Sequence, residues 1–183
     1  YCGIYDNFFP KLMQPTPLFM YFPYVQEFFA LSERDRVLCT IETLEEVSSI
    51  QGPKFVYTHI ISPHPPYLFD RDGNNTNYIK RDLLAKKTDK EIIIDKPRFI
   101  DQTIFLNKQI KKTIEEILSK YDQDNLPIII LQSDHGPSSM GHARWDEIDS
   151  KGLMERMGIL NAYFLPGINY KDNLYDTISP ANS

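Results

Sequence analysis

The chain has 183 residues, of which 42% are hydrophobic and 25% charged, so one domain with a substantial buried core is expected. The formal net charge of −5, with no basic stripe to offset it, argues against a nucleic-acid partner. The two cysteines, Cys2 and Cys39, are too few for a disulfide framework, and we interpret Cys39 as a small core residue of a helix.

Residues 1–31 are rich in aromatic side chains and proline, and this composition predicts an irregular lead-in. Their most apolar stretch, residues 17–31, is shorter than the roughly 20 residues that cross a bilayer, and Pro23 interrupts it. The stretch predicts core packing, with contact to a membrane surface as the alternative. The segment by itself is therefore expected to be soluble.

A helix is predicted from Ser32 onward. Ser32 and Asp35 have the spacing of a capping box, and Gly52-Pro53 ends the pattern. Between them, apolar residues recur every three to four positions, at Val37, Ile41, Leu44 and Val47. Residues 54–62, KFVYTHIIS, are β-prone and apolar on both faces, which predicts a buried strand of a covered sheet.

The prolines and Asp72-Gly73 of residues 63–78 predict a loop. A second helix is predicted over residues 94–121, with Pro97 in its first turn and an apolar stripe at Leu106, Ile110, Ile114, Ile117 and Tyr121. Residues 127–132 predict a second buried strand, 151–160 a weak helix and 161–166 a third strand. This order is typical of an α/β domain with a mostly parallel sheet covered by helices.

Polar residues follow two of the predicted strands. His59 and His64 end the first strand region, and Asp134 and His135 follow the second, while His142 lies in the next loop. Ligands of open α/β sheets bind beyond the carboxyl ends of the strands. We therefore expect the histidines of these two strand ends to converge with Asp134 on one site.

Asp134 and His135 are adjacent, so they are expected to be poorly placed as a pair acting on each other. A bend at Gly136 would turn both toward one ion, and mixed oxygen and nitrogen ligands suit Zn²⁺ or Mn²⁺. In the alternative interpretation Asp134 caps the next turn and His135 is an ordinary edge residue.

His64 lies between prolines that restrict its backbone, so it is a candidate to bind an anionic oxygen or to protonate a leaving group. The alternative is an ordinary surface loop. Three further residues are candidates for contact with an anionic substrate, with packing or exposure as the alternative: Arg144, Trp145 and Arg156.

Four segments together resemble the alkaline phosphatase/sulfatase superfamily: KFVYTHIISPHPPYLFDRDG, FLNKQIKKTIEEIL, PIIILQSDHGP and ERMGILNAYFLPG. The likeness covers residues 35–183 and is nearest to sulfatase-like membrane proteins related to lipoteichoic acid synthases and phosphoethanolamine transferases. It implies that residues 32–183 belong to an alkaline-phosphatase-like α/β domain. It also implies metal-dependent hydrolysis or transfer of phosphate or sulfate esters, with a lipid-linked or glycan substrate.

The resemblance further implies that Asp134 and His135 bind the divalent metal, Zn²⁺ or Mn²⁺ ahead of Ca²⁺ or Mg²⁺. His64, in the PHPPY motif, would bind the phosphoryl or sulfuryl oxygens and assist the leaving group. His59 resembles the histidine that precedes this motif in related transferases. His142 resembles a later active-site histidine and, with Arg144, would bind the substrate.

One departure from the family concerns the nucleophile and the remaining acidic metal ligands, which lie on the amino-terminal half of such domains. No segment here matches them, and the GIYD that follows Cys2 does not fit the sulfatase cysteine pattern. The chain is therefore expected to be the carboxyl-terminal part of a catalytic domain, inactive alone. Membrane anchoring by helices upstream and an extracytoplasmic catalytic domain are implied for the whole protein.

Two alternatives are open. One is a catalytically inactive domain of the same fold that docks a partner or a membrane through its aromatic face. The other is a soluble metal-dependent phosphomutase.

Overall fold

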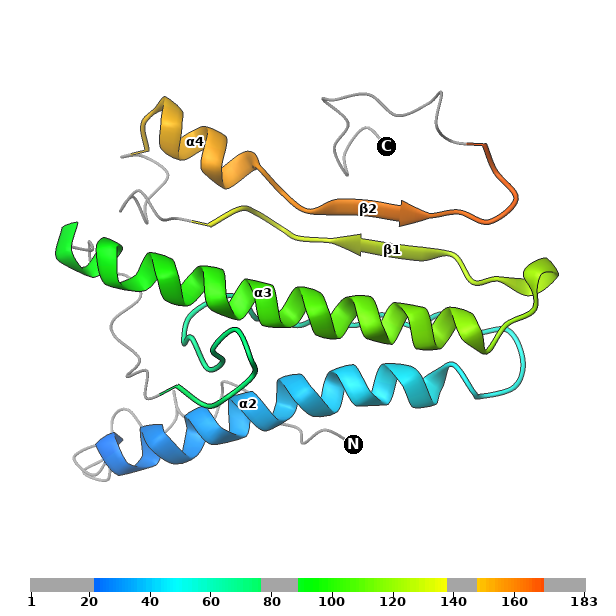
Figure 1. Ribbon diagram of the computed structural model, residues 1–183, viewed down its shortest axis with the longest axis horizontal. Helices are drawn as coiled ribbons and strands as arrows, with labels where there is room; N and C mark the ends of the chain where they lie inside the picture. Colours follow the sequence, from blue (N-terminus) through cyan, green and yellow to red (C-terminus); the bar gives the residue numbers. More distant parts are fainter. Residues whose placement is uncertain (1–21, 77–88, 138–147, 170–183) are drawn as a thin grey trace. The chain divides into compact units, whose positions relative to one another are not determined.

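The computed structural model describes residues 22–76, 89–137 and 148–169 (Figure 1). The chain divides into two compact units, each discussed by itself: Tyr1–Asp82 with Lys96–Ile117, and Leu83–Asp95 with Leu118–Ser183. The elements in chain order are α2 (Phe22–Val47), α3 (Asp89–Ser119), the 3-10 helix η2 (Gln123–Asn125), β1 (Ile129–Gln132), α4 (Ser150–Met157) and β2 (Asn161–Phe164).

Helix α2 confirms the helix predicted from Ser32 but begins ten residues earlier, at Phe22. Residues 22–31 are therefore helical, and the prediction of an irregular lead-in is wrong for them; residues 1–21 lie outside the described part of the chain. Pro23 is compatible with this start, because the first turn of a helix needs no backbone N–H from it. The helix ends at Val47, followed by a turn in which the Ile50 N–H donates to the Val47 carbonyl.

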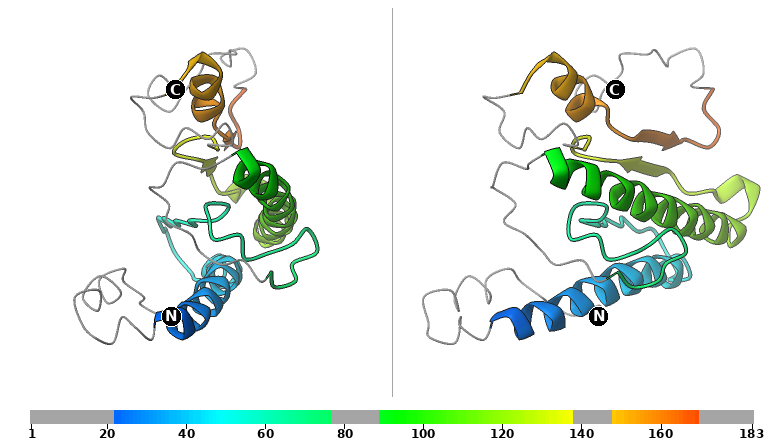
Figure 2. Two further views of the ribbon diagram at one scale, coloured as in Figure 1. Left: turned by 90° about the vertical axis from the view of Figure 1, so that its left-hand side faces the viewer. Right: turned by 60° about the vertical axis from the view of Figure 1, so that its left-hand side comes forward.

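The core of the first unit lies where the loop of residues 63–76 passes between α2 and α3 (Figures 1 and 2). The rings of Phe69 and Phe105 stack with their centroids 4.7 Å apart, and the guanidinium of Arg34 lies 5.3 Å from the Phe69 centroid. Five buried side chains form the cluster: Ile41, Leu68, Phe69, Phe105 and Leu106. An irregular loop thus supplies two of the five, Leu68 and Phe69.

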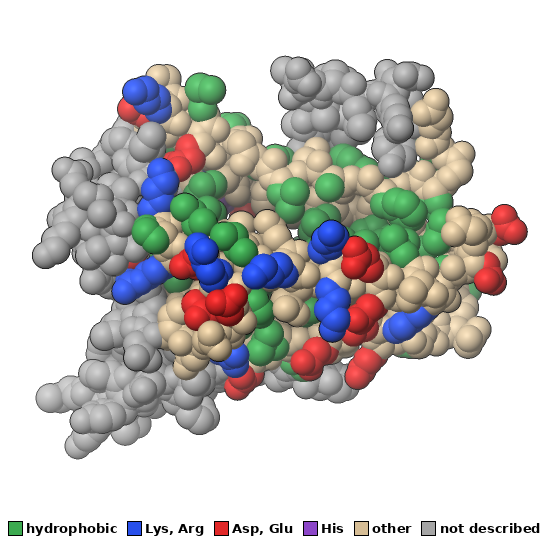
Figure 3. Space-filling model, viewed as in Figure 1, with side chains coloured by type: hydrophobic (Ala, Val, Ile, Leu, Met, Phe, Trp, Pro, Cys, Tyr) green, Lys and Arg blue, Asp and Glu red, His purple; other side chains and the backbone are tan. Residues whose placement is uncertain are grey.

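Helix α3 confirms the second predicted helix, although it begins at Asp89, so that Pro97 lies inside it rather than in its first turn. Leu106 is buried as the apolar stripe predicts. On the wet side, Lys111 pairs with Glu115 at 3.9 Å and Lys112 with Glu116 at 3.3 Å, which is the helical i,i+4 spacing. Figure 3 shows acidic and basic side chains gathered along this helix.

Residues 54–62 do not form the buried strand that their sequence predicts. They have no regular structure, and Phe55 and Tyr57 are 91% and 79% exposed. Ile60 packs against the core cluster, but Ile61 is exposed. A strand requires a partner that accepts and donates its backbone hydrogen bonds, and no described strand pairs with this segment; β-propensity alone does not supply burial.

In the second unit, β1 and β2 confirm the predicted strands at 127–132 and 161–166 in shortened form. They pair antiparallel, with Ile129 opposite Phe164 and Gln132 opposite Asn161. The prediction that residues 127–132 are buried is wrong, because Ile128 and Ile130 are 65% and 57% exposed. The described pairing neither requires nor excludes the mostly parallel, helix-covered sheet, which stays a prediction.

Helix α4 confirms the weak helix predicted at 151–160. Its N-cap is Asp149, whose carboxylate accepts a 2.7 Å hydrogen bond from the Gly152 N–H. No helix within the described ranges has the length and apolar character needed to cross a membrane.

Cys39 lies on a helix as predicted, but the interpretation as simply a small core residue is incomplete, because Cys39 is disulfide-bonded. The other cysteine of the sequence, Cys2, lies outside the described residues. Cys39 itself lies on α2, half-buried, with its sulfur 4.0 Å from the Thr43 hydroxyl.

We predict that Phe69→Ala lowers the free energy of unfolding by about 3–5 kcal/mol, because it leaves a cavity against Phe105. Phe55→Ala is the matched control, and its effect should stay within about 0.5 kcal/mol because this ring is solvent-exposed. Urea unfolding of both variants measures the difference. A loss in Phe55→Ala as large as that in Phe69→Ala would show that residues 54–62 are packed after all.

Candidate functional site

Strand β1 leads into Ser133, which the structure ties to the residue before β2. The Ser133 N–H donates to the Leu160 carbonyl at 2.9 Å, and the Leu160 N–H donates to the Ser133 hydroxyl oxygen at 3.0 Å. The Ser133 hydroxyl therefore has a structural partner in the backbone of its own unit.

Gly136 fixes the path of the chain after the two candidate ligands. Its N–H donates to the Arg156 carbonyl at 2.7 Å, which joins the turn to the last turn of α4. A Cβ atom at this position would lie 2.0 Å from the Glu155 carbonyl oxygen, so only glycine fits without displacing that backbone. The close approach explains why a glycine follows Asp134-His135.

The side chains of Asp134 and His135 turn toward each other. Asp134 Oδ2 lies 3.7 Å from His135 Nε2, and Asp134 Oδ1 accepts a 2.9 Å hydrogen bond from the His135 backbone N–H. The separation of Oδ2 and Nε2 is beyond hydrogen-bonding distance, so the expectation that the two residues are poorly placed to act on each other stays a prediction. The hydrogen bond from the His135 N–H holds the Asp134 carboxylate near the backbone of the next residue, on the side of the His135 imidazole.

His135 has one ring nitrogen committed and one available. Its Nδ1 lies 2.8 Å from the Gly136 carbonyl oxygen, and since a carbonyl only accepts, Nδ1 must carry the proton. In the neutral ring, Nε2 then presents its lone pair on the side of Asp134. A backbone carbonyl on the far nitrogen is the usual support of a metal-binding histidine.

The spacing of the two side chains can be compared with that of metal ligands. Ligand atoms at about 2.0–2.2 Å from a tetrahedral ion are about 3.3–3.6 Å from each other, close to the 3.7 Å between Asp134 Oδ2 and His135 Nε2. Within the described ranges, however, no group of three or more His, Cys, Asp or Glu side chains could hold an ion. The pair fits a metal, and it supplies at most two of its ligands.

His64 and His59 belong to the first unit, whereas Asp134 and His135 belong to the second. The His64 Nδ1 lies 2.7 Å from the Pro65 carbonyl oxygen, so its Nε2 is the available nitrogen, as in His135. His59 is exposed. The convergence of these four residues stays a prediction, and the candidates His142, Arg144 and Trp145 lie outside the described residues.

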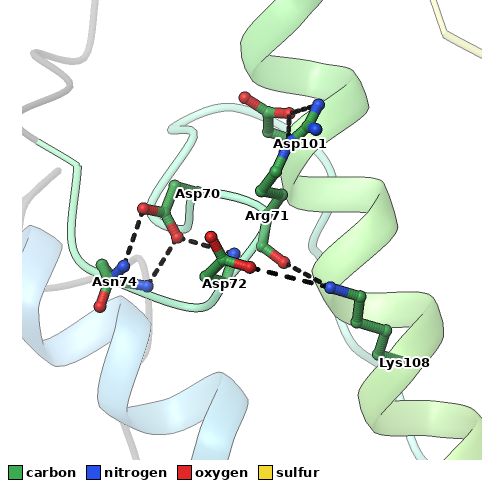
Figure 4. A network of polar contacts seen from close by, with 6 residues as sticks. All are labelled: Asp70, Arg71, Asp72, Asn74, Asp101 and Lys108. Atoms are coloured by element: carbon green, nitrogen blue, oxygen red, sulfur yellow. Dashed lines mark hydrogen bonds and ion pairs between the residues drawn. The ribbon is translucent and has the colours of Figure 1, made fainter.

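The turn that follows the PHPPY motif contains a polar network that the sequence pattern did not indicate (Figure 4). The Asp70 carboxylate accepts hydrogen bonds from the backbone N–H groups of Asp72 and Asn74 and from the Asn74 side-chain amide. From the prolines and Asp72-Gly73, the sequence predicts a loop with a turn here and no more.

The same turn is joined to α3. Arg71 donates two hydrogen bonds to one Asp101 oxygen, and the Lys108 ammonium donates to the Arg71 carbonyl at 3.1 Å. The hydrogen bond with Asp101 raises the pKa of Arg71. The side-chain amide of Asn74, followed by its backbone N–H, holds the pKa of Asp70 below its usual value.

In comparisons with protein families, curated proteins and solved structures, the chain matches none of them. The functional argument therefore depends on the residues themselves.

We predict an acid-dependent contribution of Asp70 to stability. Because its folded pKa is depressed, this contribution is present above the ordinary carboxylate pKa and is lost as pH falls through the folded pKa. Asp70→Asn should therefore destabilise the protein at pH 7 more than at about pH 2. Urea unfolding at both pH values measures it, with Asp72→Asn as the control whose carboxylate accepts none of the turn's N–H groups. An equal loss in Asp70→Asn at both pH values would contradict the assignment.

Proposed function

We propose that Asp134 and His135 are two ligands of a divalent metal in a sulfatase-like domain that hydrolyses or transfers phosphate or sulfate esters. The observation that carries the proposal is local. A carboxylate oxygen and an imidazole Nε2 lie 3.7 Å apart, and a backbone carbonyl on Nδ1 sets the tautomer that can bind an ion. The PHPPY and SDHG motifs, in this order along the chain, supply the family resemblance.

The donor set favours Zn²⁺ or Mn²⁺, because imidazole suits Zn²⁺ and carboxylate oxygen suits Mn²⁺. Ca²⁺ and Mg²⁺ prefer oxygen ligands, so they are weaker candidates for a site with a histidine. Asp134 and His135 would hold such an ion, which would supply Lewis-acid polarisation of a phosphoryl or sulfuryl oxygen.

His64 is the residue to which we assign contact with the ester. Its Nε2 is available, and the ring is exposed with Nδ1 held by the next carbonyl. An imidazole that carries a proton on Nε2 can donate a hydrogen bond to an anionic oxygen, or the proton itself to a leaving group. His59 is a further candidate catalytic residue. His142 and Arg144 remain candidate contacts with the substrate.

The attacking hydroxyl is not assigned to a described residue. Ser133 is the nearest in sequence to the proposed ligands, and its oxygen already accepts a hydrogen bond from Leu160. Within this chain, the proposal covers metal binding and contact with the ester oxygens.

The compartment is part of the proposal. A disulfide at Cys39 supports an oxidising, extracytoplasmic location, since stable disulfides are rare in the cytosol. Membrane anchoring of the whole protein is proposed from the family resemblance alone.

A second candidate function is a docking domain of the same fold without catalysis. The exposed aromatic side chains Phe55 and Tyr57, with Ile61, favour it, because contiguous exposed apolar groups commonly mark contact surfaces. Metal binding separates the two candidates, since a docking surface does not need it.

We predict that the chain binds one Zn²⁺ or Mn²⁺ weakly, because two ligands are about half of a normal tetrahedral shell. Asp134→Ala and His135→Ala should each abolish binding in calorimetry, and Zn²⁺ should shift the NMR signals of the His135 ring. Asp124→Ala, at an exposed acid of η2, is the matched control and should bind as the unaltered chain does. Tight binding that survives loss of Asp134 and His135 would place the metal elsewhere and reject the site.

We also predict that this chain alone shows no turnover of aryl phosphates or sulfates above a metal-only blank, because the described hydroxyl nearest in sequence to the proposed ligands, that of Ser133, already accepts a hydrogen bond from Leu160. In the active enzyme, His64→Ala should lower turnover by about 10²–10⁴-fold, the span of a lost acid–base group. Steady-state assays with aryl phosphate and aryl sulfate measure both. Turnover by the chain alone that is lost in Ser133→Ala would instead make this a self-contained hydrolase.

A further inference from the structure

Gln102 of α3 is a polar side chain with no exposed surface, and it lies in the core beside the loop that follows His64. Its Oε1 accepts two hydrogen bonds from consecutive backbone groups, the Leu68 N–H at 2.6 Å and the Phe69 N–H at 3.2 Å. Its Nε2 has no hydrogen-bond partner in the part of the chain that the structure describes. Burying an amide whose nitrogen is unsatisfied is unfavourable, so its presence here indicates a requirement for its oxygen.

The requirement follows from the conformation of the loop. Leu68 and Phe69 are buried outside any helix or strand, where their N–H groups have no ladder of backbone acceptors, apart from the single bridge between Phe69 and Asn75. A buried N–H needs a partner, and Gln102 supplies one acceptor for both. The amide oxygen thus replaces the neighbouring strand that these residues lack.

The loop is held from its other sides as well. The Phe69 ring stacks on Phe105, and Arg34 of α2 donates to the Gly73 carbonyl at 3.1 Å. Gly73 has a φ of +87°, and a Cβ there would lie 2.4 Å from the Phe105 ring. Gln102 therefore acts on a segment that is already close-packed, and its hydrogen bonds select one position for it.

His64 is connected to this anchored segment by a short, stiff link. Pro65 and Pro66 stand between His64 and Tyr67, and their rings lock two of the intervening φ angles. Pro66 and Tyr67 are buried, whereas His64 is exposed. His64 itself is closed into a turn by its N–H, which donates to the Ile61 carbonyl at 3.0 Å.

We propose that Gln102 is a positioning residue for His64. By holding the N–H groups of Leu68 and Phe69, it fixes the buried end of the proline link, and the link fixes the outer end where the His64 ring donates to the Pro65 carbonyl. The His64 ring is thereby held in one orientation, and in the neutral ring Nε2 is the nitrogen that can take up the proton offered to the ester. The inference rests on the proposed role of His64 in contacting the ester.

The first test uses the unaltered chain. Amide hydrogen exchange followed by NMR should show the N–H groups of Leu68 and Phe69 exchanging at least roughly tenfold more slowly than in an unstructured peptide. Exchange of both at the unstructured rate would overturn the proposal, since Gln102 would then hold nothing.

The second test reads the His64 ring in variants. Gln102→Met keeps the volume and removes the acceptor, whereas Gln102→Glu keeps an acceptor oxygen in either protonation state. Gln109→Met, the same substitution two turns along α3, is the control. Long-range ¹H–¹⁵N spectra should show the Nδ1–H tautomer of His64 in the unaltered chain, Gln102→Glu and Gln109→Met, and a mixture of tautomers in Gln102→Met. An unchanged His64 spectrum in folded Gln102→Met would refute the positioning role.

If Gln102→Met does not fold, Gln102→Asn takes its place, because it withdraws the same amide by one methylene group and should produce the same mixture. If every Gln102 variant fails to fold, Gln102→Glu included, the proposal is overturned in favour of a purely structural role.

In the active enzyme, Gln102→Met should lower kcat with metal content unchanged, and Gln102→Glu should restore kcat. A His64 spectrum that responds to Gln102 while His64→Ala leaves turnover intact would keep the positioning and reject the proposed function instead.

Discussion

The first unit depends on the burial of Phe69 between α2 and α3. Its ring stacks on Phe105 and lies beneath the Arg34 guanidinium, while Gln102 satisfies the N–H groups of Leu68 and Phe69. Without these hydrogen bonds an irregular backbone could not enter a core, because unpaired buried N–H groups are too unfavourable. The ring belongs to the apolar cluster to which α2 contributes Ile41 and α3 contributes Phe105 and Leu106. Packing and polar satisfaction here stabilise the same short segment.

The exposed and buried ends of that segment have different chemistry. Residues 66–69 are buried, but His64 and the turn at residues 70–75 reach solvent, where Asp70 organises the backbone and Arg71 and Lys108 connect the turn to α3. A reactive side chain held on such an anchored link loses little conformational entropy when it meets a ligand. This is the physical basis for assigning His64, rather than the exposed and less constrained His59, the principal contact with the ester.

The turn after β1 is also held by specific contacts, but fewer groups take part. Gly136 packs against the backbone at the end of α4, where no side chain would fit, and the Gly136 carbonyl in turn sets the tautomer of His135. Because the ordering groups are main-chain atoms, the geometry of the Asp134–His135 pair depends little on surrounding side chains. The chemistry proposed for the pair therefore depends on a local backbone arrangement and on further ligands from elsewhere.

Sequence alone determined the features that have local causes. The 3.6-residue periodicity of α2 and α3, the turn at Asp72-Gly73 and the cores of β1 and β2 follow from neighbouring residues, so pattern was sufficient for them. Sequence also indicated Asp134, His135 and His64 as candidate site residues, because residue types and spacing can be read from the sequence.

Tertiary structure decided the rest. Residues 54–62 have a strand's composition but no described strand partner, and most of them stay exposed. Asp134 faces His135 because of a backbone hydrogen bond. Gln102, an ordinary residue of an amphipathic helix, is the hydrogen-bond acceptor for a loop more than thirty positions away. Burial and pairing depend on contacts distant in sequence, which no local pattern contains.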